Sequence, residues 1–162
     1  MKRTLFAFCI LAVCVVLALP ACTDPNAVID QNTELVNSNW SYANKLKYAV
    51  KIDDANIAYN LCLNLRVTAD YKYSNIFVLM HETGGPDYKP VAVRYEFKLA
   101  NKDGEWLGAG SGNIYSYQVP FRTNYKFPAK GTYYFEFEQN MRDNPLREVS
   151  DVGLRVEKAQ GQ

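Results

Sequence analysis

Apolar and polar residues alternate with a period of two along most of the chain after Trp40. Successive side chains of a β-strand point to opposite faces of the sheet, so each alternating run predicts a strand with one buried and one solvated face. The runs cover residues 46–52, 59–67, 91–99, 133–138 and 152–156. The segment 76–80 is continuously apolar, which is typical of a strand in the centre of a sheet.

Turn-forming residues separate these runs. They include Gly84-Gly85-Pro86, Asp103-Gly104, Lys130-Gly131 and Asn144-Pro145, which favour turns and loops. No long segment in this part of the chain repeats with the period of a helix. We therefore expect an all-β fold, namely a jelly-roll-like antiparallel β-sandwich of about 7–9 strands, formed by one domain over residues 40–162.

The first residues have the features of a secretion signal. Lys2 and Arg3 precede an uninterrupted apolar run from Leu5 to Leu19. A basic start and an apolar segment of about 15 residues are typical of a signal peptide, and the run is short for a transmembrane helix, which needs about 20 residues. We predict a signal peptide over residues 1–21.

The segment Leu19-Pro20-Ala21-Cys22 resembles the cleavage box of bacterial lipoproteins. In that chemistry the cysteine thiol takes a diacylglycerol, the signal is cut before the cysteine, and the new amine receives a further acyl chain such as palmitate. We therefore predict lipidation of Cys22, because several acyl chains, at about 0.8 kcal/mol for each buried CH₂, hold a protein permanently in a membrane. The alternatives are an ordinary signal peptide or an anchoring helix.

Processing before Cys22 leaves Cys62 as the only unmodified cysteine, because Cys9 and Cys14 lie in the signal. The mature chain therefore has neither an internal disulfide nor a cysteine-based zinc site.

The segment that follows the signal is mostly polar and contains no lysine or arginine up to Asn39. It predicts a flexible tether over residues 22–39, with one short paired segment near Val28-Ile29. A flexible coil of this length spans roughly 20–25 Å.

The charge balance excludes one class of partner. Eighteen Lys and Arg against seventeen Asp and Glu give a net charge of +1. Nucleic-acid binding needs a concentrated basic face, so we expect no nucleic-acid partner. The same balance means that lipid, rather than charge, must hold the protein at a membrane.

Candidate catalytic groups are few. His81 is the only histidine, and no Gly-x-Ser-x-Gly motif accompanies it. Glu136 and Glu138 share one strand face at a spacing of about 7 Å, a distance at which two carboxylates can catalyse glycoside hydrolysis. Acidic residues are also common on the solvated face of a strand, and we prefer that interpretation. We therefore expect no enzyme, and no catalytic, cofactor-binding or metal-binding residues.

A glycine-rich segment, with Gly108, Gly110 and Gly112, follows Trp106. It lacks the Lys-Ser/Thr and the helix of a phosphate loop. Alternating glycines predict backbone that passes close under a large side chain, with Trp106 as the expected occupant, or a strand that bends at the sandwich edge.

Aromatic residues crowd the region between Tyr115 and Phe127. Exposed aromatic rings on a β-sandwich stack on sugars, whereas buried ones fill the core, and the sequence alone leaves this choice open. A surface carbohydrate-binding lipoprotein is therefore the alternative function. Its stacking residues would be Tyr115, Tyr117 and Tyr125.

Several motifs occur in a characteristic order. They are Cys22, Trp40, Leu65-Arg66, Tyr71-Lys72-Tyr73-Ser74-Asn75-Ile76, Gly104-x-Trp106-Leu107-Gly108-x-Gly110-x-Gly112-x-Ile114-Tyr115, Gly131-x-Tyr133, Gln139-x-Met141-Arg142-x-x-x-Leu146 and Asp151-Val152-Gly153-Leu154-Arg155. Together they resemble the gliding-motility lipoprotein family GldH of the Bacteroidetes, over about residues 40–158. The segment 146–149 departs from the family pattern, which has a small residue such as glycine there.

This resemblance implies a non-enzymatic lipoprotein of the cell envelope, anchored to the outer membrane or to the periplasmic face of the inner membrane. Its implied partners are other envelope proteins of the gliding and type IX secretion apparatus, or of secretion and envelope assembly in relatives that do not glide.

The resemblance assigns a structural or partner-binding role to Arg66, Trp106, Gln139, Arg142, Asp151 and Arg155. We expect the arginines and Gln139 to brace strand ends by hydrogen bonds to backbone carbonyls; partner contact is the alternative. The polar stretch 139–147 is either a surface loop or a partner contact.

Overall fold

The structure of the chain, a computed structural model, describes residues 24–86 and 89–159. The predicted signal peptide and Cys22 lie outside the described residues. The elements are β1 (Ala27–Glu34), a short 3-10 helix η1 (Val36–Ser38), β2 (Asn39–Trp40), β3 (Leu46–Ile52), β4 (Tyr59–Thr68), β5 (Asn75–Gly84), β6 (Val91–Lys98), β7 (Ala109–Ser111), β8 (Ile114–Tyr125), β9 (Gly131–Gln139), β10 (Leu146–Arg147) and β11 (Val149–Lys158). Among the described residues, no helix is long and apolar enough to cross a lipid bilayer.

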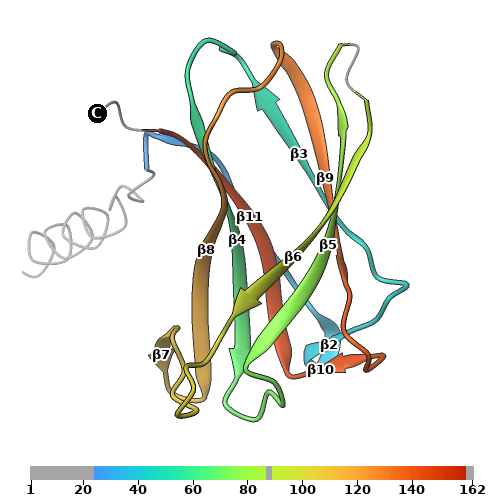
Figure 1. Cartoon of the computed structure of the whole chain (residues 1–162), viewed down its shortest axis with the longest axis vertical. Coiled ribbons are helices and arrows are strands. Elements are labelled where there is room, and N and C mark those ends of the chain that lie inside the picture. Colours follow the sequence, from blue (N-terminus) through green and yellow to red (C-terminus); the bar gives the residue numbers. More distant parts are fainter. Residues whose placement is uncertain (1–23, 87–88, 160–162) are drawn as a thin grey trace, which may run out of the picture.

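Two antiparallel sheets form the body of the molecule (Figure 1). The first sheet has the order β1-β11-β4-β8-β7 and the second has the order β3-β9-β5-β6, while β2 and β10 form a separate pair. The all-β antiparallel sandwich predicted from the sequence is therefore confirmed. Eleven strands exceed the expected range because β2, β7 and β10 are only two or three residues long, too short to show a period.

The core lies between the two sheets and follows the alternation of the sequence. Along β3, Leu46, Tyr48, Val50 and Ile52 are at most 4% exposed, whereas the lysines between them face solvent. The segment 76–80 belongs to β5, which lies between β9 and β6 as expected for a central strand. Burial of these large apolar side chains supplies the main stabilising free energy of the sandwich.

The structure corrects the predicted tether over residues 22–39 for the part that it describes, where only a short paired segment near Val28-Ile29 was expected. Residues 27–34 form β1, which pairs antiparallel with β11, and Leu35 is buried. An edge strand has one neighbour only and its outer side chains face water, so its composition can be as polar as that of a loop. The described sandwich therefore includes residues that precede Trp40.

The strand directions define two ends of the sandwich. The near end carries the segment 24–26, the end of β11 and the loops 53–58 and 126–130, because Ala27 lies opposite Glu157 and Tyr59 opposite Lys158. The far end carries η1, β2, β10 and the loops 69–74, 99–108 and 139–148 (Figure 1). The ten residues of β11 span about 30 Å between the two ends.

An ion pair joins the two sheets inside the molecule. Glu82 of β5 is fully buried, and its Oε2 contacts Nη1 of Arg122 on β8. Burial alone would lower the pKa of Arg122, but the charge of Glu82 and hydrogen bonds with Tyr95 and Glu82 raise that pKa above its usual value. The guanidinium therefore stays charged within the sandwich.

Candidate functional site

The 139–148 loop leaves β9 at the far end and is organised by one buried side chain. Gln139 is fully buried, and its Nε2 donates to the carbonyl of Asp143 at 3.0 Å. Its Oε1 accepts from the N–H of Met141 at 2.8 Å. Gln139 therefore braces the end of β9 and closes the first turn of the loop.

Replacing Gln139 with leucine is expected to loosen this loop. The substitution keeps most of the side-chain volume but removes both hydrogen bonds, and each polar group that stays buried without a partner costs about 1–3 kcal/mol. We expect a lower free energy of unfolding, measured in urea, and faster amide hydrogen exchange over residues 140–148. Gln118→Leu, at an exposed glutamine on β8, is the control and should change neither quantity by a comparable amount.

Contacts from two other far-end segments hold the loop in place. Asp143 Oδ2 accepts from the hydroxyl of Tyr73 at 2.7 Å and from Nζ of Lys72 at 3.2 Å. These two hydrogen bonds, from Tyr73 and then from Lys72, lower the pKa of Asp143. Asp143 is therefore ionised at neutral pH and ties the loop to the segment 69–74.

A second set of contacts comes from β2 and the turn after it. The hydroxyl of Tyr42 donates to the carbonyl of Met141, and the N–H of Tyr42 donates to Asn144 Oδ1 at 3.0 Å. Trp40, which is fully buried, pairs with Leu146 in the β2–β10 ladder. The 139–148 loop is thus held from several sides and presents a defined surface.

This surface combines cationic and apolar groups. Arg142 and Arg147 are exposed, and neither forms an ion pair with another described residue. They border a groove of about 540 Å³. Three of the four exposed large apolar side chains of the described sandwich also lie at the far end. They are Val36, Tyr42 and Leu107.

Arginine, tyrosine and apolar side chains are the groups that dominate protein–protein interfaces. The far end is therefore the candidate functional site. Sequence reasoning singled out Gln139 and Arg142 and included Asp143 and Arg147 in the polar stretch 139–147, but it missed Tyr42. Their grouping depends on contacts between segments far apart in the sequence.

Two arginines expected to bind backbone carbonyls bind carboxylates instead. Arg66 on β4 contacts Oδ1 of Asp151 on β11, and Arg155 contacts Asp24, Asp30 and Glu157. The predicted bonding of these two arginines to backbone carbonyls is therefore wrong. The physical reason is that a charge-assisted pair between a guanidinium and a carboxylate is stronger than a bond to a neutral carbonyl.

The glycine-rich segment is crossed by tyrosines rather than by Trp106. A side chain at Gly108 would meet the ring of Tyr117 at 2.7 Å, and one at Gly110 would meet the ring of Tyr115 at 3.2 Å. Trp106 packs instead against Tyr71 and Tyr115, with ring centroids 6.5 and 5.5 Å apart. The backbone does pass close under large side chains, as expected. These side chains are Tyr115 and Tyr117 rather than Trp106.

The three tyrosines proposed for sugar stacking are part of the packing. Tyr117 is 8% exposed, and its hydroxyl donates to the carbonyl of Leu99 at 2.8 Å. Its predicted role as a stacking platform is therefore wrong. Tyr115 and Tyr125 are half-buried and pack against Trp106 and Phe127.

The acids considered for hydrolysis lie in a surface charge network. Glu136 pairs with Lys45 and Lys47 at 3.3 and 3.1 Å, and Glu138 pairs with Lys45 at 3.0 Å. Burial alone would raise the pKa of Glu136, but hydrogen bonds from Lys47 and Lys45 outweigh it and lower that pKa. His81 Nε2 lies 3.9 Å from Glu138. A lysine-paired glutamate of lowered pKa is poorly suited to act as a general acid at neutral pH.

Comparison with solved structures finds a partial resemblance to a viral chain, described as the structure of infectious bursal disease virus, Gx strain. The sequence identity is 13%, the match covers 88% of this chain and 37% of that chain, and the TM-score is 0.32. A similarity at that level carries no argument about function.

Comparison of sequences finds close relatives. The profile of the GldH lipoprotein family matches residues 27–156, which includes β1. A gliding motility lipoprotein GldH homolog of Christiangramia forsetii is 32% identical over 127 residues, covering 74% of this chain and 78% of the relative. The gliding motility lipoprotein GldH of Flavobacterium johnsoniae is 28% identical over 141 residues, covering 83% and 86%. The match spans nearly the whole described sandwich, and the chain belongs to the GldH lipoprotein family.

Proposed function

We propose that this chain is an envelope protein that is lipidated at Cys22 and works in gliding motility and type IX secretion. It acts by binding other envelope proteins through its far end, without catalysis. Membership in a lipoprotein family supports the membrane anchor. The relatives from Christiangramia forsetii and Flavobacterium johnsoniae, both named for gliding motility, support the role in movement.

The placement of the far end is the observation that carries this proposal. The described chain begins at Asp24, two residues after Cys22, and Asp24 lies at the near end. The exposed Arg142 and Arg147 lie at the opposite end of β11, about 30 Å from that point. An anchor on Cys22 therefore leaves the arginines and the exposed apolar side chains directed away from the membrane.

Reversing the charge of both far-end arginines tests the proposal. In the double variant Arg142→Glu/Arg147→Glu, we expect loss of colony spreading and of type IX secretion when it replaces the wild-type protein. Charged residues at an interface steer association and exclude wrong partners, so a reversed pair opposes binding. The variant should accumulate in membranes at the wild-type level.

The matched control is Lys47→Glu/Lys51→Glu on β3. These lysines are 73% and 77% exposed and form surface ion pairs, which contribute about 0–1 kcal/mol each. The control has the same change in net charge and should spread and secrete normally. Normal spreading and secretion by the far-end variant would contradict the proposal.

A further inference from the structure

One arginine on the outer face of β11 gathers three carboxylates at the near end. The Arg155 side chain is 13% exposed. Its Nη1 contacts Asp30 Oδ2 at 2.7 Å, its Nε donates to Glu157 Oε2 at 2.8 Å, and its Nη2 contacts Asp24 Oδ2. These hydrogen bonds, first to Asp30 and then to Glu157, raise the pKa of Arg155, so its charge is permanent. Arg155 thus joins the start of the described chain to β1 and β11.

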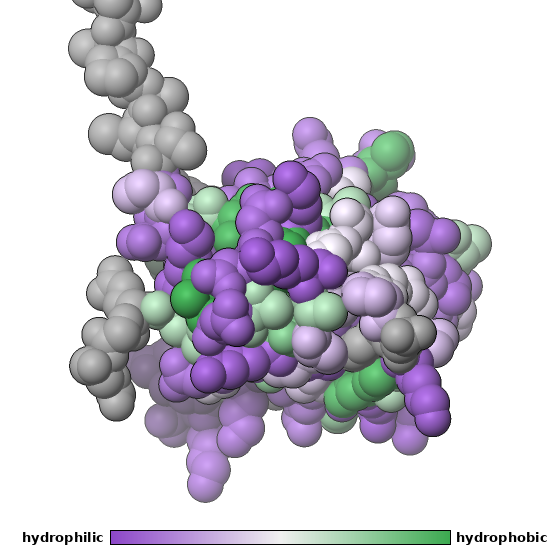
Figure 2. All heavy atoms as spheres, turned by 90° about the horizontal axis from the view of Figure 1, so that it is seen from above, coloured by the Kyte–Doolittle hydropathy of each residue, from purple (hydrophilic) through white to green (hydrophobic). Residues whose placement is uncertain are grey.

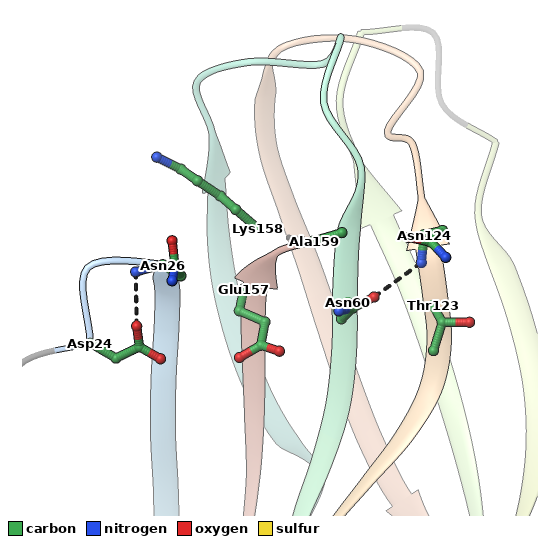
Figure 3. A pocket seen from close by; sticks show the side chains of 8 residues that line it. All are labelled: Asp24, Asn26, Asn60, Thr123, Asn124, Glu157, Lys158 and Ala159. Atoms are coloured by element: carbon green, nitrogen blue, oxygen red, sulfur yellow. Dashed lines mark hydrogen bonds between the residues drawn. The ribbon is translucent and has the colours of Figure 1, made fainter. Parts of the chain in front are cut away.

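Backbone bonds fix the same segment. Asp24 Oδ1 accepts from the N–H of Asn26 at 2.9 Å, a bond drawn in Figure 3. The carbonyl of Asp24 accepts from Ala27, and the carbonyl of Asn26 accepts from Lys158. Asp24 is therefore fixed to the sheet edge by its side chain and by its backbone. We call these contacts of Arg155 and Asp24 the N-terminal clamp.

The clamp leaves very little chain between the sandwich and the lipid. Cys22 precedes Asp24 by two residues, and two residues reach at most about 7 Å when fully extended. A tether of residues 22–39 would have allowed roughly 20–25 Å. The point of lipid attachment is therefore close to the near end.

We propose that the near end of the sandwich rests on the lipid headgroup layer, and that the N-terminal clamp holds it there. This inference rests on the proposed function, because it needs the lipid on Cys22. The near end becomes a membrane-contact surface, and the long axis of the sandwich stands away from the bilayer.

The chemistry of the near end suits headgroups rather than hydrocarbon. Figure 2 views this end and shows hydrophilic side chains over much of it, with smaller groups of apolar side chains between them. A hollow on the same end is lined mainly by polar and charged side chains (Figure 3). Lys126, Lys130 and Lys158 are exposed at this end and can contact lipid phosphates, while the carboxylates of Asp24, Asp53, Asp54 and Glu157 offset much of its positive charge. Polar groups do not enter the acyl region without a large cost.

Amine labelling of the lipidated full protein in lipid nanodiscs tests the contact. The nanodiscs contain phosphatidylethanolamine and phosphatidylglycerol, and mass spectrometry measures acetylation of each lysine. Relative to a form that starts at Thr23, lacks the signal and the lipid, and is free in solution, we expect Lys126, Lys130 and Lys158 to react about fivefold more slowly, which corresponds to about 1 kcal/mol for each lysine at an anionic surface. Lys98 and Lys102, exposed at the far end, should react equally in both samples.

Two variants separate the clamp from the anchor. Arg155→Met removes the side-chain contacts of the clamp with Asp24, Asp30 and Glu157. Labelling of the three near-end lysines should then rise toward the rate in solution. Arg66→Met is the matched control, because Arg66 also lies on the outer face of the first sheet and pairs with Asp151, without contact to Asp24. It should keep the wild-type protection.

The mass of the N-terminal peptide distinguishes the two proposals. A Cys22 without lipid would overturn both of them. Suppose instead that Cys22 is lipidated but the near-end lysines of the wild-type protein react as fast in nanodiscs as in solution. That result would overturn the membrane contact alone. Near-end lysines that stay as protected in Arg155→Met as in the wild type would refute the role of the clamp. Unchanged acetylation of the far-end lysines in Arg155→Met serves as the control that the variant is folded.

Discussion

Replacing Arg122 with leucine is expected to destabilise the sandwich by about 3–5 kcal/mol, because it leaves a buried carboxylate without its counter-charge. Glu82 is completely buried, and the Arg122 side chain is only 15% exposed. Glu82 lies on β5 and Arg122 on β8, so the pair connects the two sheets. Equilibrium unfolding in urea, followed by circular dichroism, measures the loss of stability.

The double variant Glu82→Leu/Arg122→Leu should be less destabilised than Arg122→Leu alone. Replacing both charges of a buried pair with apolar groups removes the unpaired charge and is often nearly neutral. Lys51→Leu is the surface control: its ion pair with Asp53 is exposed on both sides and should contribute about 0–1 kcal/mol. A double variant as unstable as the single one would show that shape, rather than charge, makes the pair important.

Truncation of Trp40 to alanine should cost about 3–5 kcal/mol, the range for removing a buried tryptophan or phenylalanine. Trp40 is fully buried, and its Nε1 donates to the carbonyl of Asn44 at 2.9 Å. Since Trp40 also pairs with Leu146, the variant should release the 139–148 loop as well. Urea unfolding measures the first effect, and amide hydrogen exchange of residues 140–148 measures the second.

Trp106→Ala provides the comparison at the same end of the molecule. Trp106 is half-buried and packs on the rim, against Tyr71 and Tyr115. Its truncation should cost less than that of Trp40 and should leave exchange in the 139–148 loop unchanged. Equal costs for the two tryptophans would mean that Trp40 has no special role at the far end.

The sequence predicted the strands that have one buried face, because burial itself produces the period of two. The inner residues of β3 and β9, such as Tyr48 and Phe135, were identified in this way and are buried. Of β1, only a short paired segment near Val28-Ile29 was predicted, because its outer face is polar and its single neighbour, β11, lies more than a hundred residues away. No local pattern encodes such a pairing.

The candidate site was predictable only in part. The motif around Gln139 and Arg142 drew attention to the 139–148 loop. Its partners Tyr42 and Tyr73 come from other loops, and only the closure of the sandwich brings them together. The bonding of Arg155 was missed for the same reason, because Asp24 and Asp30 lie in the segment expected to be a tether.

The pairing of β1 with β11 has a practical consequence for visualising the protein in cells. Since these strands run in opposite directions, Asp24 and Ala159 lie at the same end of the sandwich, where both line the hollow of Figure 3. In the proposed orientation, a fluorescent fusion attached after Ala159 would crowd the end that faces the lipid and leave the arginine-bearing end unobstructed. An epitope inserted in the hairpin between β7 and β8 would instead lie at the far end, next to the surface proposed to recognise partners.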